Sequence, residues 1–253
     1  MVWALEAGAV DTRGLTLEPV VSDIQTLNEW ALEGRLEVTA LSAAAYAEVA
    51  DQYRLLPHGA SFGDGYGPIV VARRELTLDE LRDTEIVIPG RLTTAYLALR
   101  LALGEELRVR ALPFDQVLDE VVSGRAEAGL IIHEGQLTYA GAGLVNLLDT
   151  GVWWRDETGL PLPLGLVAIR RDVERAGDVA AVLREAIDAG LANREEAMRY
   201  AAGFGRGIDD ETADEFVAMY VNDLTLDMGD RGRAAVAELL RRSGAAAHAE
   251  FVA

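Results

Sequence analysis

The sequence predicts a mixed α/β fold with two lobes, and three features of the chain support this prediction. Strand patterns alternate with helix patterns up to about residue 171, as in α/β proteins with parallel sheets. Hydrophobic residues make up 50% of the 253 residues but aromatic residues only 6%, which suits helices packed on a sheet. A compact block of strand–helix units also has one strand on each side. We therefore predict a small lobe over 74–165 and a large, discontinuous lobe over 1–73 and 166–253.

The first 53 residues predict three helices and two strands. A helix over 1–8 is followed by 15–21 (LTLEPVV), which alternates as a strand does. The helix 23–34 has apolar residues at helical spacing and ends on a glycine, a natural C-cap. The strand 36–42 leads directly into the helix 43–53.

The next part of the chain introduces the predicted small lobe. Residues 53–67 are rich in glycine and predict a loop after a short strand. Aliphatic runs then predict strands over 68–74 and 85–90, the second ending in a Pro-Gly turn. The helices between and after them are expected over 76–83 and 93–104.

Strands and helices continue to alternate to residue 171, after which the pattern is only helical. We expect strands over 107–113, 129–134 and 144–150, a helix over 114–128, a helical turn over 151–159, and a short helix or loop over 137–143. The segment 160–171 begins as a proline-bearing linker and becomes a strand. Later helices are expected over 179–193, 194–205, 209–223 and 230–244.

Charge and composition exclude several classes of function. The net charge of −19 disfavours nucleic acid and membranes as partners, because both are anionic. The chain has no cysteine, and all 23 basic residues are arginine, so thiol nucleophiles, Schiff-base lysines and P-loop lysines are absent. Neither a targeting segment nor a run of about 20 apolar residues is present. We expect a cytoplasmic protein.

Candidate ligand-binding groups lie where predicted strands end, since ligands of open α/β sheets bind at the carboxyl ends of strands. Ser42 ends one strand and starts a helix, where it either caps the helix or offers a hydroxyl. Arg91, Thr93 and Thr94 follow another strand at a helix N-terminus, which favours an anion.

His133 ends the strand of the stretch GLIIHEG and is the candidate general base. The alternative is a structural histidine bonded to a backbone carbonyl. The 3 histidines have no ligand-like spacing, so no metal site is expected.

Several stretches together make the chain similar to a known family. They are TLNEWALEGRL, ALSAAAYA, GPIVVARR, IPGRLTTAYLAL, EAGLIIHEGQLTY, GVWWRDETGLPLPLG and YVNDLTLDMG. The sequence resembles the 1,4-dihydroxy-6-naphthoate synthases of the futalosine route to menaquinone. The resemblance covers nearly the whole chain, and the GLIIHE and TGLPLPLG blocks are its most specific parts.

The resemblance implies a fold, a reaction and a set of site residues. The fold is that of type II periplasmic binding proteins, with a ligand cleft between two lobes. The reaction is a cofactor-independent lyase step that converts cyclic dehypoxanthine futalosine to 1,4-dihydroxy-6-naphthoate and a three-carbon fragment. His133 would be the base, Ser42, Thr94 and Asn28 would line the pocket, and Thr93 would help to hold the substrate carboxylate.

Two departures from the family and two alternative functions stay open at this point. The family begins with a strand and a Gly-x-Ser-Pro-Cys-Pro-Asn-Asp-Thr-Phe loop, whereas this sequence begins at MVWALEAGAV. We expect a misplaced start rather than a true truncation. Ala40 stands where the family carries a lysine. The alternatives are chorismate dehydratase of the same pathway and a non-catalytic protein that binds a small carboxylate. A homodimer is left open.

Overall fold

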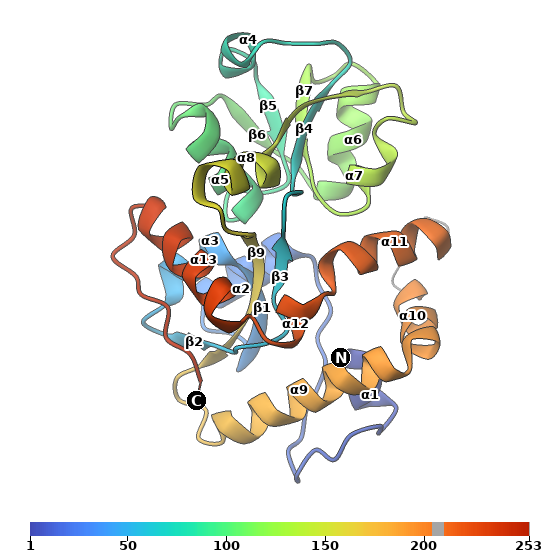
Figure 1. Cartoon of the computed structure of the whole chain (residues 1–253), viewed down its shortest axis with the longest axis vertical. Helices are drawn as coiled ribbons and strands as arrows, with labels where there is room; N and C mark the ends of the chain where they lie inside the picture. Colours follow the sequence, from blue (N-terminus) through green and yellow to red (C-terminus); the bar gives the residue numbers. More distant parts are fainter. Residues whose placement is uncertain (204–209, 253) are drawn as a thin grey trace.

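The computed structural model describes residues 1–203 and 210–252, which form two lobes (Figure 1). The strands are β1 Val38–Ser42, β2 Tyr53–Leu55, β3 Ser61–Gly63, β4 Ile69–Ala72, β5 Ile86–Ile88, β6 Val109–Ala111, β7 Ala128–Ile131, β8 Val145–Asp149 and β9 Leu162–Arg170. The helices are α1 Val2–Glu6, α2 Ile24–Leu32, α3 Ala43–Val49, α4 Leu78–Arg82, α5 Thr94–Leu103, α6 Phe114–Val122, α7 Gly135–Thr138, α8 Thr150–Thr158, α9 Ala176–Ala192, α10 Arg194–Ala202, α11 Asp210–Tyr220, α12 Asp223–Leu226 and α13 Gly229–Arg242.

The sheet of the lower lobe is built around the long strand β9. Strands β1, β2 and β3 all pair with β9, and all three pairings are antiparallel. Alternate residues of β9 face opposite sides, as the period of a strand requires. Leu166 packs into the core under α3 and α13, whereas Val167 packs against α9 on the other face.

The upper lobe has a five-stranded sheet in the order β6-β5-β7-β4-β8. Strand β5 pairs in parallel with β6 and β7, and β4 is antiparallel to β7 and β8. Both faces are covered: Ile86 and Leu130 pack toward α5, and Val87 packs toward α6. This double cover explains why these strands are continuous aliphatic runs.

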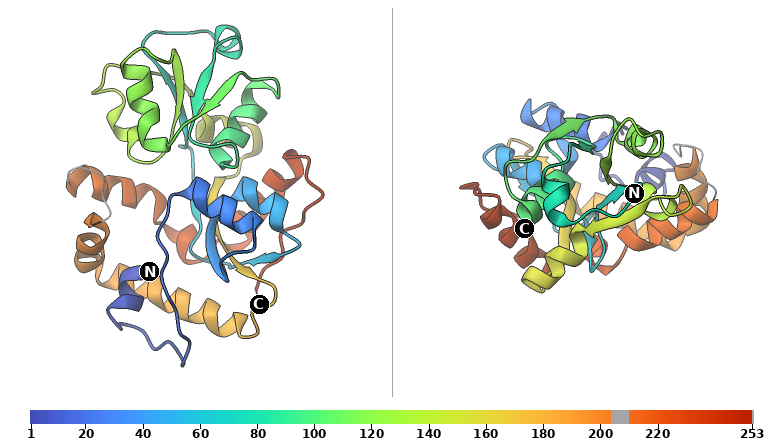
Figure 2. Two further views of the ribbon diagram at one scale, coloured as in Figure 1. Left: turned by 180° about the vertical axis from the view of Figure 1, so that it is seen from behind. Right: turned by 90° about the horizontal axis from the view of Figure 1, so that it is seen from above.

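The chain passes between the sheets twice, after β3 and before β9 (Figures 1 and 2). The two connections touch: a Cβ built on Gly151 of α8 would lie 1.9 Å from the carbonyl oxygen of Tyr66, so α8 can approach there only without a side chain. Thr150 reinforces the contact by donating to the carbonyl of Pro68. The chain leaves the lower sheet near residues 64–68 and returns to it near residues 159–161.

One expectation about the sheets differs from the structure, and the predicted lobe boundaries are not tested by it. The expected parallel sheets are present only in part: β5 pairs in parallel with β6 and β7, whereas β9 returns from the upper lobe and runs against its three neighbours. The division at 73/74 and 165/166 stays a prediction, but the sheets change earlier: β4 belongs to the upper sheet, and Leu162–Gly165 already pairs in the lower one.

The segment 15–21 is not a strand, contrary to its alternating pattern. Pro19 removes a ladder donor from its middle, and Val20 and Val21 are 53% and 61% exposed. The predicted helix 43–53 ends at Val49. Those parts of the expected helices 194–205 and 209–223 that fall on 204–209 lie outside the described residues.

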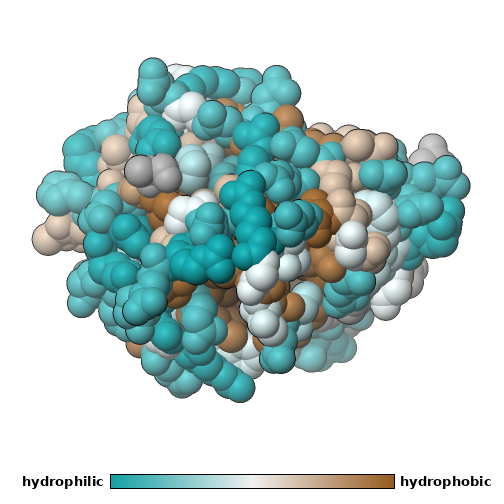
Figure 3. All heavy atoms as spheres, turned by 90° about the horizontal axis from the view of Figure 1, so that it is seen from below, coloured by the Kyte–Doolittle hydropathy of each residue, from teal (hydrophilic) through white to brown (hydrophobic). Residues whose placement is uncertain are grey.

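The lower face of the molecule is mainly polar (Figure 3). Hydrophilic residues cover most of the face seen from below, with smaller apolar areas between them (Figure 3). Within the described part of the chain, no helix has both the length and the apolar character needed to cross a membrane.

Candidate functional site

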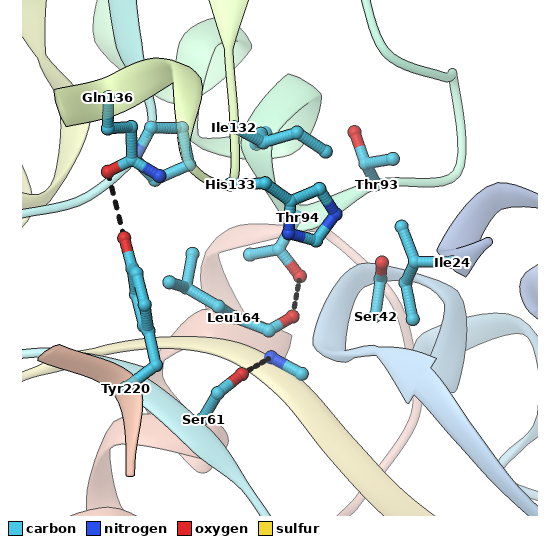
Figure 4. Close-up of a pocket in the computed structure, with 13 residues that line it drawn as sticks. Ile24, Ser42, Ser61, Thr93, Thr94, Ile132, His133, Gln136, Leu164 and Tyr220 are labelled. Atoms are coloured by element: carbon cyan, nitrogen blue, oxygen red, sulfur yellow. Dashed lines mark hydrogen bonds between the residues drawn. The ribbon is translucent and has the colours of Figure 1, made fainter. Parts of the chain in front are cut away.

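A cavity of about 240 Å³ lies where the two lobes meet (Figure 4). Its walls are formed by Ile24, Ser42, Ser61, Pro68, Thr93, Thr94, Ala95, Ile132, His133, Gln136, Leu164, Gly165 and Tyr220. None of these lining residues is an arginine, aspartate or glutamate. An apolar pocket with a few converging polar groups is the usual form of a small-molecule site.

His133 reaches into this cavity from the upper lobe (Figure 4). Strand β7 ends at Ile131, three residues before the predicted end at 134, and His133 lies in the turn that follows, with φ of 58°. Its imidazole packs edge-on against Phe114 with ring centroids 4.6 Å apart. Left-handed backbone is uncommon for a residue with a Cβ and concentrates at functional sites.

The N-terminus of α5 forms the adjacent wall of the cavity. Thr93 caps the helix: its Oγ1 accepts from the Tyr96 N–H at 3.2 Å and donates to the Gly90 carbonyl at 2.8 Å. The N–H groups of Thr94 and Ala95 have no acceptor among the residues that the structure describes. A helix N-terminus with free N–H groups favours an anionic ligand.

Thr94 lines the cavity, but its hydroxyl also connects elements of the two lobes. Oγ1 accepts from the Ala44 N–H at 3.1 Å and donates to the Leu164 carbonyl at 2.8 Å. The side chain is 2% exposed. Thr94 therefore offers the cavity mainly its backbone N–H.

Asn28 does not line the cavity and is 0% exposed. Its Oδ1 accepts from the Ser42 N–H at 2.7 Å, and its Nδ2 donates to Ser42 Oγ at 3.0 Å. The same Nδ2 lies 3.3 Å from the Leu92 carbonyl. The amide thus fixes Ser42 and leaves the Ser42 hydroxyl free to donate into the cavity.

Arg91 lies outside the cavity. It is exposed and donates to the Val109 carbonyl at 3.2 Å. It lines a separate groove of about 650 Å³ together with Gln25 and Phe114. The structure therefore brings Ser42, Thr93, Thr94 and His133 to one cavity and leaves Arg91 beside it.

Ser61, Gln136 and Tyr220 also line the cavity, and the sequence patterns did not single them out. Ser61 Oγ accepts from the Gly165 N–H at 3.1 Å, but its segment had the composition of a loop. The Tyr220 hydroxyl is hydrogen-bonded to the side-chain amide of Gln136. Burial raises the pKa of Tyr220 well above its usual value, so this phenol stays protonated.

Solved structures first place the chain in a class of protein. It superposes with a TM-score of 0.65 on the ligand-binding component of an ABC-type import system from Staphylococcus aureus, at 13% identity over 91% of this chain and 82% of that one. It superposes with a TM-score of 0.67 on a Candida albicans protein with the generic periplasmic binding protein fold, at 13% identity over 98% and 87%. The predicted fold class is confirmed: this is a protein with a periplasmic-binding-protein-like fold.

The sequence comparisons are more specific. The family model for menaquinone biosynthesis matches residues 1–245, and the chain belongs to this family. A 1,4-dihydroxy-6-naphthoate synthase from Thermus thermophilus is 44% identical over 96% of this chain and 89% of its own length. A synthase of the same name from Streptomyces coelicolor is 36% identical over 90% and 83%. A crystal structure from Archaeoglobus fulgidus superposes with a TM-score of 0.90 at 45% identity, over 96% of this chain and 91% of that one.

Proposed function

We propose that the chain is a carbon–carbon lyase of menaquinone biosynthesis that converts cyclic dehypoxanthine futalosine to 1,4-dihydroxy-6-naphthoate and a three-carbon fragment. Membership of the family and the names of the two relatives support this activity. The observation that carries it is the position of His133 in an otherwise uncharged cavity between the lobes. A protein that only binds its ligand has no need of a base there.

His133 acts as the general base in this proposal. Cleavage of the retro-aldol type requires a base to take the proton of a hydroxyl while the carbon–carbon bond breaks. The chain has no lysine to form an imine, so the electrons of that bond flow into the ring that becomes aromatic. A positioned base and hydrogen-bond donors are then sufficient for the reaction.

The substrate carboxylate binds at the start of α5. The free N–H groups of Thr94 and Ala95 and the hydroxyl of Ser42 face the same cavity and would hold it. Thr93 fixes the helix end, and Asn28 acts through Ser42. Helix N–H groups replace a cationic side chain, which fits a cavity without arginine.

The other partners and the location follow from the same reaction. The only partner that it requires is a small carboxylate, and we propose a cytoplasmic enzyme that needs no metal or organic cofactor.

The test is to incubate the purified chain with cyclic dehypoxanthine futalosine and to detect products by mass spectrometry. We expect the naphthoate to form with wild-type protein and to depend on His133. Binding of the substrate without product would favour a carboxylate-binding protein. Turnover of chorismate instead would favour the dehydratase of the same pathway.

A further inference from the structure

The amide of Gln136 joins three parts of the molecule beside the cavity. With its oxygen toward the His133 turn, Oε1 accepts from the His133 N–H at 3.2 Å and from the Tyr220 hydroxyl at 3.0 Å. In this orientation Nε2 donates to the Gly67 carbonyl at 2.6 Å and also lies 2.8 Å from the Tyr220 hydroxyl oxygen. We assign the amide this orientation because its oxygen then faces donors and its nitrogen faces acceptors.

The His133 backbone requires such a partner. Its φ of 58° is costly for a residue with a Cβ and persists only where the surroundings hold it. The turn is also tight, because a Cβ on Gly135 would lie 2.5 Å from Ile131 Cγ2. The hydrogen bond from the His133 N–H to Gln136 is therefore one of the contacts that fix the direction of the imidazole.

Tyr220 anchors this turn to the other lobe. It lies at the end of α11, is 9% exposed, and forms an edge-to-face pair with Tyr66 at 5.5 Å between ring centroids. The Tyr66 hydroxyl in turn donates to the Met219 carbonyl. Tyr220 is thus held beside the connection between β3 and β4, with its hydroxyl directed at Gln136 (Figure 4).

We propose that Tyr220 and Gln136 form a latch between the lobes that positions His133 for catalysis. The Tyr220 hydroxyl orients the Gln136 amide, and that amide holds the left-handed backbone of His133. Tyr220 comes from α11 and Gln136 from α7, so opening of the lobes breaks their hydrogen bond. The base is then fully aligned only when the cavity is closed. Both are positioning residues, and the kinetic part of the proposal rests on the proposed function.

The kinetic test compares Tyr220→Phe with Tyr53→Phe. Tyr53 also donates one hydrogen bond, at 2.8 Å to the Leu36 carbonyl, but lies in β2 and outside the cavity lining. We expect Tyr220→Phe to lower kcat by up to about tenfold, which corresponds to the free energy of one hydrogen bond. KM should change less than about threefold. Tyr53→Phe should keep kcat. Equal kcat values for Tyr220→Phe and wild type would overturn the latch.

A pair of Gln136 variants tests the amide itself. Gln136→Glu keeps an oxygen that can accept from the His133 N–H and from the Tyr220 hydroxyl. Gln136→Leu removes this acceptor and therefore both hydrogen bonds. We expect the order of kcat to be wild type, then Gln136→Glu, then Gln136→Leu. A Gln136→Leu variant as active as Gln136→Glu would contradict the positioning role.

Hydrogen–deuterium exchange tests the latch without any turnover. We expect Tyr220→Phe to speed exchange in the peptide spanning 132–138 about threefold or more, because a lost hydrogen bond lowers the local opening free energy. Tyr53→Phe should leave that peptide unchanged. If wild type proves inactive on the proposed substrate, faster exchange still supports the latch, and unchanged exchange refutes it.

Discussion

Replacing Asn28 by leucine should destabilise the protein although the two side chains are similar in size. Asn28 is fully buried and makes three hydrogen bonds, at 2.7 and 3.0 Å to Ser42 and at 3.3 Å to the Leu92 carbonyl. Leucine would leave the Ser42 N–H and the Leu92 carbonyl without their partner.

The expected cost follows from those two groups. A buried polar group that loses its partner costs about 1–3 kcal/mol, and the extra apolar surface of leucine offsets about 1 kcal/mol. Two such groups cost about 2–6 kcal/mol, so the net loss of unfolding free energy should be about 1–5 kcal/mol, which lowers Tm by roughly 2–20 °C in a protein of this size.

Scanning calorimetry on wild type, Asn28→Leu and Asn146→Leu measures this loss. Asn146 is exposed on β8 and makes no side-chain hydrogen bond to the residues that the structure describes, so Asn146→Leu controls for the substitution itself. It should change stability by no more than about 0.5 kcal/mol. A Tm for Asn28→Leu that is as high as that of the control would refute the role of the buried amide.

Two further predictions concern stability. Gly151→Ala should lower the free energy of unfolding by about 3 kcal/mol or more, because the new Cβ would meet the Tyr66 carbonyl oxygen. The control Gly177→Ala, in the open first turn of α9, should be neutral or stabilising. Equal Tm values for the two variants in thermal unfolding would contradict the close approach of α8 to Tyr66. Burial, followed by the charge of Arg184, lowers the pKa of His58 below its usual 6.5, so the unfolded state binds the proton more readily. The free energy of unfolding should therefore fall as the pH drops below about 6.5, by up to about 1.4 kcal/mol per pH unit. In a His58→Gln variant measured by urea unfolding, this contribution to the pH dependence should be absent.

The sequence predicts most of the elements but not how they pair. The runs that became β5 and β7 are clear because strands buried on both faces are uninterrupted aliphatic stretches. The direction of β9 cannot be seen in its own residues, since it depends on where the chain re-enters the lower lobe. The strand predicted over 15–21 does not form, because an alternating pattern is typical of a strand but a strand also needs a neighbouring strand to pair with.

The candidate site divides in the same way. Ser42 and His133 were found because they end apolar runs, and both line the cavity. Asn28 and Ser61 show what the sequence could not predict. A polar side chain can face a ligand or form a buried hydrogen bond, and groups far away in the sequence decide which of the two occurs. Tyr220 reaches the cavity from a helix 84 positions away from its partner Gln136, and no local pattern records such a contact.

The most direct test of the central claim is the steady-state kcat of His133→Ala on cyclic dehypoxanthine futalosine, with substrate binding measured by calorimetry on the same protein. If His133 is the general base, kcat falls by about 10²–10⁴-fold while the substrate still binds, because the start of α5 and Ser42 are intact. Wild-type turnover in His133→Ala would contradict the assignment of the base.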